Sequence, residues 1–166
     1  SGTTRDAVDT HYNAFGFEMI LVDTAGIRKK SKVHEDIEFY SVMRAIRAIE
    51  DCDVCLFMID ANEGLQKQDL SIFSVIEKNK KGVVLLVNKW DTIEKDTHST
   101  KSFEEDILSK IAPFTDLPIL FVSALSKQRI HKALETALEV YHNRMQKITT
   151  SKPVSYTHLT LPTNDR

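Results

Sequence analysis

The stretch Val83-Val84-Leu85-Leu86-Val87-Asn88-Lys89-Trp90-Asp91 decides the fold of this chain. Its first five residues are apolar, and such a short run bounded by polar residues predicts a buried β-strand. Similar runs alternate along the sequence with segments of helical spacing, which indicates an α/β protein with a doubly wound, mostly parallel sheet. In such sheets ligands bind beyond the carboxyl ends of the strands, so we expect a binding site to begin at Asn88.

Asn88, Lys89 and Asp91 have the chemistry needed to read a guanine base. Guanine carries two adjacent donors on its Watson–Crick edge, and a carboxylate can accept from both. Adenine places an acceptor there, so Asp91 would select GTP over ATP, and sites of this kind discriminate by roughly 10⁴ to 10⁵. Asn88 can bond the other edge of the base and brace the neighbouring loop, while the stem of Lys89 can lie along the purine face. The same residue types are common at strand ends for local reasons, which leaves a purely structural role open.

An Asp-x-x-Gly turn at residues 23–26 follows another apolar run. Asp23 can hold Mg²⁺ through its water shell, because this ion accepts oxygen ligands and retains several waters. The backbone N–H of Gly26 can approach a terminal phosphate, since no side chain blocks it. Near the start of the chain, the hydroxyl of Thr4 can complete the metal shell, and Thr3 is the alternative ligand.

The segment Ser123-Ala124-Leu125 follows the apolar run 118–122. Its backbone N–H groups can donate to O6 of a guanine base. It lies after the Asn-Lys-x-Asp motif in the sequence, as the Asp-x-x-Gly turn lies before it. The order and spacing of these segments agree with a single nucleotide site.

With these motifs the chain resembles the Era-like branch of translation-factor-type GTPases and, within it, the double-GTPase family called Der or EngA. The resemblance covers residues 1 to about 153. Four segments carry it: residues 1–6 are similar to switch I, residues 21–30 to switch II of the second GTPase (G) domain, residues 88–91 to the base-specificity motif, and residues 141–152 to the exit toward a C-terminal KH-like domain.

The resemblance implies a P-loop NTPase-type sheet with one antiparallel edge strand. It implies GTP or GDP as ligand, Mg²⁺ held by Thr4 and through water by Asp23, and K⁺ in the intact protein. It also implies GTP hydrolysis during assembly of the large ribosomal subunit, with that particle or its RNA as partner. No catalytic side chain is assigned, because Ile27 stands where many small GTPases place a water-orienting Gln.

The phosphate-binding loop of such proteins, Gly-x-x-x-x-Gly-Lys-Ser/Thr, does not occur in this sequence. We therefore expect residues 1–153 to be a truncated G domain that lacks the first strand and the phosphate loop. In the family, that strand lies between the strands that correspond here to residues 17–22 and 53–59. We expect a gap between them, their collapse onto each other, or a foreign segment in the slot.

Residues 154–166 depart abruptly from the family pattern. The sequence VSYTHLTLPT at residues 154–163 matches a translated transposase-type sequencing adaptor. We therefore expect a non-native, adaptor-derived tail, which takes no part in the fold. The alternative is a genuine polar linker rich in Ser, Thr and Pro.

The composition is that of an ordinary globular domain, with 42% hydrophobic and 28% charged residues in a chain of 166. The net charge of -2 gives no general nucleic-acid footprint, and we expect a cytoplasmic protein with no DNA or membrane partner. Cys52 and Cys55 form a C-x-x-C. In a strand over residues 53–59, side chains three apart point to opposite faces, which predicts core thiols that are neither metal ligands nor a redox pair.

Periodicity predicts strands and helices in alternation. The first two strands are close enough to form a hairpin through residues 14–16, and Ser102 with Glu105 has the form of a capping box at the third helix. The predicted strands are near residues 7–14, 17–22, 53–59, 83–87 and 118–122. Apolar residues at helical spacing predict four helices. They include, helix by helix, Ile46 and Ile49; Leu70, Phe73 and Ile76; Phe103, Ile107 and Ile111; and Ile130, Leu134 and Leu138.

The function that these features favour is guanine-nucleotide binding and GTP hydrolysis in assembly of the large ribosomal subunit, as part of a longer protein. Two alternatives remain. The protein can be a non-catalytic, GTP-gated module that binds RNA or the ribosome, or a different Era-like GTPase such as a tRNA-modification GTPase.

Overall fold

The structure is a computed structural model and describes residues 9–22, 35–94 and 99–150. Strands and helices alternate at the predicted places. In chain order the elements are β1 (Asp9–Ala14), β2 (Phe17–Val22), α1 (Glu35–Asp51), β3 (Val54–Asp60), α2 (Lys67–Lys78), β4 (Gly82–Asn88), the 3-10 turn η1 (Trp90–Thr92), α3 (Ser99–Ile111), β5 (Ile119–Phe121) and α4 (Ile130–Thr150).

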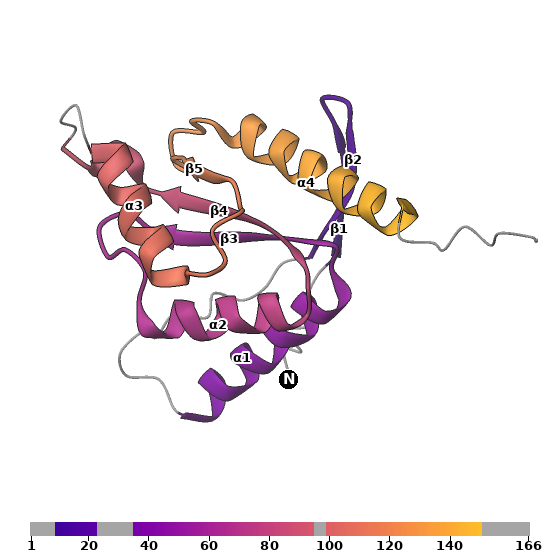
Figure 1. Cartoon of the computed structure of the whole chain (residues 1–166), viewed down its shortest axis with the longest axis horizontal. Coiled ribbons are helices and arrows are strands. Elements are labelled where there is room, and N and C mark those ends of the chain that lie inside the picture. Colours follow the sequence, from indigo (N-terminus) through magenta and orange to yellow (C-terminus); the bar gives the residue numbers. More distant parts are fainter. Residues whose placement is uncertain (1–8, 23–34, 95–98, 151–166) are drawn as a thin grey trace, which may run out of the picture.

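A three-stranded parallel sheet in the order β3-β4-β5 forms the centre of the molecule. Its register pairs Val54 with Gly82 and Asp60 with Asn88, so β3 and β4 end together at one edge. Helix α4 covers one face of this sheet, and α1 and α2 lie on the other (Figure 1). Helices on both faces of a parallel sheet confirm the predicted α/β fold class.

β4 is the most deeply buried strand that the structure describes. Its residues Val84, Leu85 and Val87 have no exposed surface, and Leu86 is 3% exposed. Val84 and Leu86 pack with Val122 and with Ala133 of α4. Leu85 and Val87 pack on the opposite face in a cluster with Ile107 and Phe121. The apolar run 83–87 therefore fills both layers of the core.

β1 and β2 form the predicted antiparallel hairpin. Phe15 and Gly16 connect them with φ of 55° and 79°. Two successive residues of positive φ are the signature of the tight turns whose twist matches a hairpin. The ring of Phe15 meets that of His131 edge-on, with centroids 4.5 Å apart, so the hairpin contacts α4.

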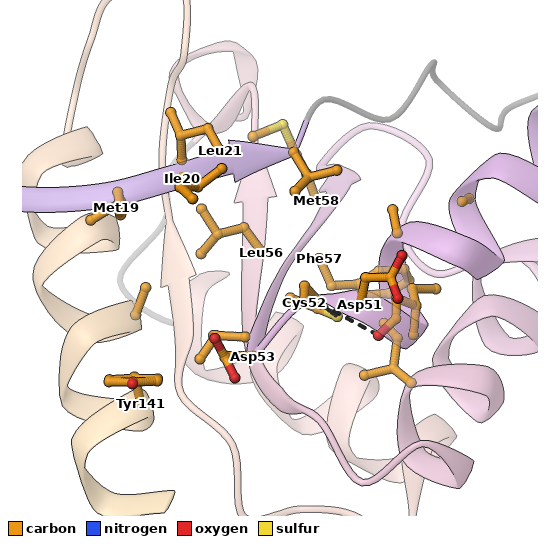
Figure 2. A pocket seen from close by; sticks show the side chains of 18 of the residues that line it. Met19, Ile20, Leu21, Asp51, Cys52, Asp53, Leu56, Phe57, Met58 and Tyr141 are labelled. Carbon is orange, nitrogen blue, oxygen red and sulfur yellow. Dashed lines mark hydrogen bonds between the residues drawn. The ribbon is translucent and has the colours of Figure 1, made fainter. Parts of the chain in front are cut away.

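β2 and β3 belong to separate sheets, and among the described residues neither has another strand on the side where they face each other. A cavity of about 910 Å³ lies between them. Side chains from β2, β3 and α4 surround it, including Ile20, Leu56 and Tyr141 (Figure 2). The predicted gap between residues 17–22 and 53–59 is thus confirmed in the form of an open slot. Ile20, Leu56 and Met58 are 57%, 38% and 47% exposed, respectively.

Two predictions about local structure are wrong. α3 begins at Ser99, so Ser102 lies inside the helix and cannot cap it. Cys52 and Cys55 do not point to opposite faces, because their Sγ atoms are 3.4 Å apart. β3 begins only at Val54, and Cys52 lies in the turn before it, where the alternation of a strand does not apply.

In the parts of the chain that the structure describes, no helix is both long and apolar enough to cross a membrane.

We expect the 166-residue chain to unfold below about 50 °C, the lower part of the range of mesophilic domains. Each backbone group left dry and unpaired along the slot costs about 1 to 3 kcal/mol, against a typical net stability of about 5 to 15 kcal/mol. Circular dichroism during heating measures the transition, and a sharp transition above about 50 °C would contradict the expectation. Hydrogen exchange gives a local check, since the backbone amides of β4 are expected to exchange more slowly than those of β2 and β3.

Candidate functional site

Asn88 ends β4 and joins it to the loop that follows β5. Its side-chain Oδ1 accepts a hydrogen bond of 2.9 Å from the backbone N–H of Ala124. Its backbone carbonyl accepts another, also of 2.9 Å, from the N–H of Ala61 just beyond β3. The predicted bracing of the neighbouring loop by Asn88 is therefore confirmed, and this residue holds three strand ends together.

Lys89 adopts the left-handed conformation, with φ of 62° and ψ of 30°. This conformation is uncommon outside glycine and turns the chain sharply at the end of the strand. Thr92 donates two hydrogen bonds to the backbone carbonyl of Lys89, one of 3.0 Å from its backbone N–H and one of 2.8 Å from its hydroxyl. The ammonium group of Lys89 lies 2.6 Å from the Oδ2 of Asp60. The side chain of Lys89 is thus fixed by the next strand of the sheet.

Asp60 is the last residue of β3, and its side chain is 15% exposed against 57% for Lys89. Its Oδ1 accepts hydrogen bonds from Asn62, 2.9 Å from the backbone N–H and 3.1 Å from the side-chain amide. Burial opposes ionisation of Asp60, but the hydrogen bonds from Lys89 and Asn62 outweigh it and lower the pKa of this carboxyl. Asp60 is therefore a carboxylate at neutral pH.

Trp90 anchors the turn in the core. The residue is 7% exposed, and its backbone N–H donates to the backbone carbonyl of Val122 at 3.1 Å. Its ring packs against Phe121 with centroids 4.4 Å apart and against Phe103 at 5.6 Å. Because Trp90 points inward, its neighbour Asp91 is left on the surface, exposed to solvent. Within the described ranges the Asp91 carboxylate has no hydrogen-bond or ion-pair partner, so it can accept donors from a ligand.

The buried residue Ser123 holds the loop that follows β5. Ser123 is 1% exposed, and its hydroxyl accepts the N–H of Ser126 at 3.2 Å. Its backbone pairs with that of Gln128 in both directions, at 3.2 and 2.9 Å. Ala124 and Leu125 project outward, and Leu125 is 93% exposed. A loop held at Ser123 can present the backbone of Ala124 and Leu125 to a ligand.

The structure brings together the two predicted segments at the carboxyl edge of the parallel sheet, residues 88–91 and 123–125. Asp23, Gly26, Thr4 and the alternative Thr3 lie outside the described residues. Sequence reasoning missed Asp60, Asn62 and Thr92, which hold Lys89 in place. An acidic residue directly after the apolar run 54–59 was the available signal for Asp60.

The predicted metal site is not among the residues whose placement is described. In those residues, no three His, Cys, Asp or Glu side chains gather in a way that could hold a metal ion. The cavity between β2 and β3 is also separate from the edge that carries Asn88 and Asp91, and its walls are mainly apolar.

The model of one protein family, described as 50S ribosome-binding GTPase, matches residues 1–89. A GTPase Der of Flavobacterium johnsoniae is 63% identical over 152 residues, which is 92% of this chain and 35% of that protein. One of Bacteroides fragilis is 61% identical over 153 residues, with the same shares of each chain. The chain thus spans about a third of the length of these relatives.

A solved structure also has this fold. The crystal structure of Era in complex with MgGDPNP and nucleotides 1506–1542 of 16S ribosomal RNA superposes with a TM-score of 0.69 at 30% sequence identity. The match covers 84% of this chain and 46% of that chain. The predicted resemblance to Era-like and Der-type proteins is confirmed.

We expect the change Asp60→Asn to destabilise the chain at pH 7 by roughly 0.5 to 1 kcal/mol, because it removes the charge paired with the half-exposed Lys89. The folded pKa of Asp60 lies below the unfolded value of about 3.9. Its stabilisation is therefore complete above the unfolded pKa and is lost as the pH falls through the folded pKa. Urea unfolding at several pH values measures this difference. The exposed Asp116→Asn serves as control, and a difference that persists unchanged at strongly acidic pH would contradict the assignment.

Proposed function

Because the chain belongs to the family of 50S ribosome-binding GTPases, we propose that it supplies the guanine-recognising part of a GTP-hydrolysing protein that acts on the ribosome. The observation that carries the proposal is the joined edge of β4 and β5. There the braced Asn88, the fixed Lys89 and the outward Asp91 lie beside the loop of Ala124. A purine ring fits this chemistry because it offers hydrogen-bonding edges and flat apolar faces.

Asp91 is the residue proposed to choose the base. Its exposed carboxylate has two acceptor oxygens for the two adjacent donors of guanine. The stem of Lys89 supports one face of the ring, while its ammonium group stays on Asp60 at 2.6 Å. The N–H groups of the Ser123-Ala124-Leu125 loop are proposed to receive O6. In this arrangement binding costs the protein little conformational entropy, because Lys89 and the loop are already held in place.

The phosphates are proposed to lie toward residues 23–26. Gly26 would offer its N–H to the terminal phosphate, and Asp23 and Thr4 are the residues proposed for Mg²⁺, with K⁺ as a further ion in the intact protein. Bound Mg²⁺ would neutralise charge on the phosphate oxygens. Because Ile27 follows Gly26, we assign no catalytic side chain, and hydrolysis would depend on positioning and electrostatics.

The proposed partner is the large ribosomal subunit or its RNA, bound by the complete protein during assembly. The description of the family and the ribosomal RNA in the Era structure support this choice. Turnover of GTP that rises on adding large subunits, but not small subunits, would support it. GTP-dependent binding without turnover would favour the non-catalytic module, and stimulation by tRNA alone would favour a tRNA-modification GTPase.

In a full-length protein that contains this domain, we expect Asp91→Asn to weaken GDP binding at least about tenfold and to improve binding of XDP. An amide can donate to the 2-oxo group that xanthine carries where guanine has its amine. Titration with labelled GDP and XDP measures both affinities. Glu94→Gln is the matched control, because Glu94 is an exposed acid on the same loop. Unchanged GDP affinity in Asp91→Asn would rule out the base-reading role.

We expect the 166-residue chain alone to bind GTP only weakly. It contains the residues proposed for the base, but no Gly-x-x-x-x-Gly-Lys-Ser/Thr loop to surround the phosphates, where most of the charge of GTP lies. Calorimetry with GTP and Mg²⁺ should give little heat. A dissociation constant in the micromolar range or tighter would show that this sequence holds the phosphates in another way.

A further inference from the structure

Lys89 is the residue on which the contacts between the end of β3 and the turn after β4 converge. β3 and β4 run side by side and end at the same edge of the sheet (Figure 1). The turn η1 follows Lys89 and ends at Thr92. Asp60 ends β3, and Asn62 follows it and contacts Thr92. Three side chains outside the motif at residues 88–91 are therefore close enough to influence it.

The hydrogen bonds among these residues close into a ring. The ammonium group of Lys89 lies 2.6 Å from Oδ2 of Asp60, and Oδ1 of Asp60 accepts from the side-chain amide of Asn62 at 3.1 Å. The same amide nitrogen donates to the hydroxyl oxygen of Thr92 at 3.0 Å. The hydroxyl of Thr92 in turn donates to the backbone carbonyl of Lys89 at 2.8 Å. The ring thus begins at the side chain of Lys89 and returns to its backbone.

The carboxylate of Asp60 has one oxygen for each of its two neighbours. Oδ2 faces the ammonium group of Lys89, and Oδ1 also accepts the backbone N–H of Asn62 at 2.9 Å. Hydrogen bonds to an ionised acceptor are the stronger kind, and Asp60 is ionised at neutral pH. An amide in its place can keep the bonds to Asn62 through its oxygen, but it turns an NH₂ group toward Lys89. Asp60→Asn therefore removes the contact with Lys89 and can keep the contact with Asn62.

Lys89 combines a fixed backbone with a long side chain. Its φ of 62° is a conformation that a lysine keeps only where its surroundings hold it, and the hydroxyl of Thr92 bonds its carbonyl. Its side chain is 57% exposed although the ammonium group lies on Asp60. A free lysine side chain samples many rotamers and loses that freedom when a ligand orders it. Because its end is held, the stem of Lys89 is ordered before a ligand binds.

We propose that Asp60 is a positioning residue for guanine nucleotides. Asp60 does not touch the nucleotide. It holds the end of Lys89 and, together with Asn62 and Thr92, keeps the stem of Lys89 where one face of the purine binds. The inference rests on the proposed function, in which the purine lies on this stem. It adds that the end of β3 sets the affinity for the face of the base, whereas Asp91 reads the edge.

The test is a double-mutant cycle in a full-length protein that contains this domain and whose other G domain is made unable to bind nucleotide. Asp60→Asn is expected to weaken GDP binding roughly two- to tenfold, because the ordering of one long side chain then falls on the binding step. Lys89→Met keeps an unbranched stem that needs no anion to hold it. In the Lys89→Met background, Asp60→Asn should change the GDP affinity by less than about 1.5-fold.

Asp106 and Lys110 on α3 provide a matched control cycle. Their side chains form an ion pair of 2.7 Å on the surface, at 53% and 40% exposure. Asp106→Asn should leave the GDP affinity unchanged, with or without Lys110→Met. The control separates the tether of Lys89 from the general effect of removing one surface ion pair.

The preference between GDP and IDP separates the face of the base from its edge. Hypoxanthine lacks the 2-amino group of guanine but presents a ring face of the same shape. Asp60→Asn should therefore weaken GDP and IDP by the same factor, whereas Asp91→Asn should change their ratio. Titration with labelled GDP, and competition by IDP, measures both affinities.

Thr92 tests the other side of the ring. Thr92→Val keeps the shape of the side chain but removes the hydroxyl that joins Asn62 to the carbonyl of Lys89. GDP should dissociate faster from this variant. Thr92→Ser retains a hydroxyl and should restore the wild-type rate. Stopped-flow release of labelled GDP measures these rates, and circular dichroism at the assay temperature establishes that folded proteins are compared.

Equal losses of GDP affinity from Asp60→Asn in the wild-type and Lys89→Met backgrounds would overturn the proposal, because Asp60 would then act through the fold and not through Lys89. Release from Thr92→Ser as fast as from Thr92→Val would overturn the part assigned to the ring. Both results leave the proposed function intact as long as Asp91→Asn weakens GDP binding. Failure of Asp91→Asn to do so would instead reject the proposed function, whatever the cycle shows.

Discussion

β4 lies between β3 and β5 with both of its faces withdrawn from water, and this burial positions everything else in the structure. Val84 and Leu86 anchor α4 on one face, and Leu85 and Val87 bind the layer of α2 and α3 on the other. Burying such aliphatic side chains contributes about 1.5 to 3 kcal/mol each. A strand held from both faces cannot slip by one residue without reversing its side chains. The position of Asn88 at its end is fixed for the same reason.

The geometry of the proposed site follows from that position through contacts between strand ends. Asn88 reaches the loop after β5, and Lys89 reaches Asp60 at the end of β3. The buried Trp90 keeps the turn from swinging outward. The ion pair of Lys89, its left-handed conformation and the burial of Trp90 thus fix the segment 88–91. Asp91, the last residue of this segment, is left on the surface. Its carboxylate, which has no partner among the described residues, stands beside a rigid turn and is placed for binding rather than for stability.

The sequence predicts the parts of this arrangement that depend on local pattern, and it fails where distant residues meet. The buried run 83–87, the hairpin turn and the helical stripes are all readable from periodicity. The ion pair of Lys89 with Asp60 joins the residue after β4 to the last residue of β3, so neither residue alone indicates it. For Cys52 the error had another source. The alternation of β3 was extended into the preceding turn, where the helix end and not the pleat sets the direction of the side chain.

The slot between β2 and β3 depends on what holds the hairpin and the sheet apart. The ring of His131 on α4 contacts both Phe15 and Phe17, at 4.5 and 6.2 Å, so the hairpin is attached to a helix rather than to the sheet. α4 in turn is anchored to β4 through Ala133. Closing the slot by pairing β2 with β3 would pull the hairpin off α4 and would cost these aromatic contacts. Leaving it open keeps Leu56 and Met58 partly in water. The same core that positions Asn88 therefore also holds the hairpin away from β3.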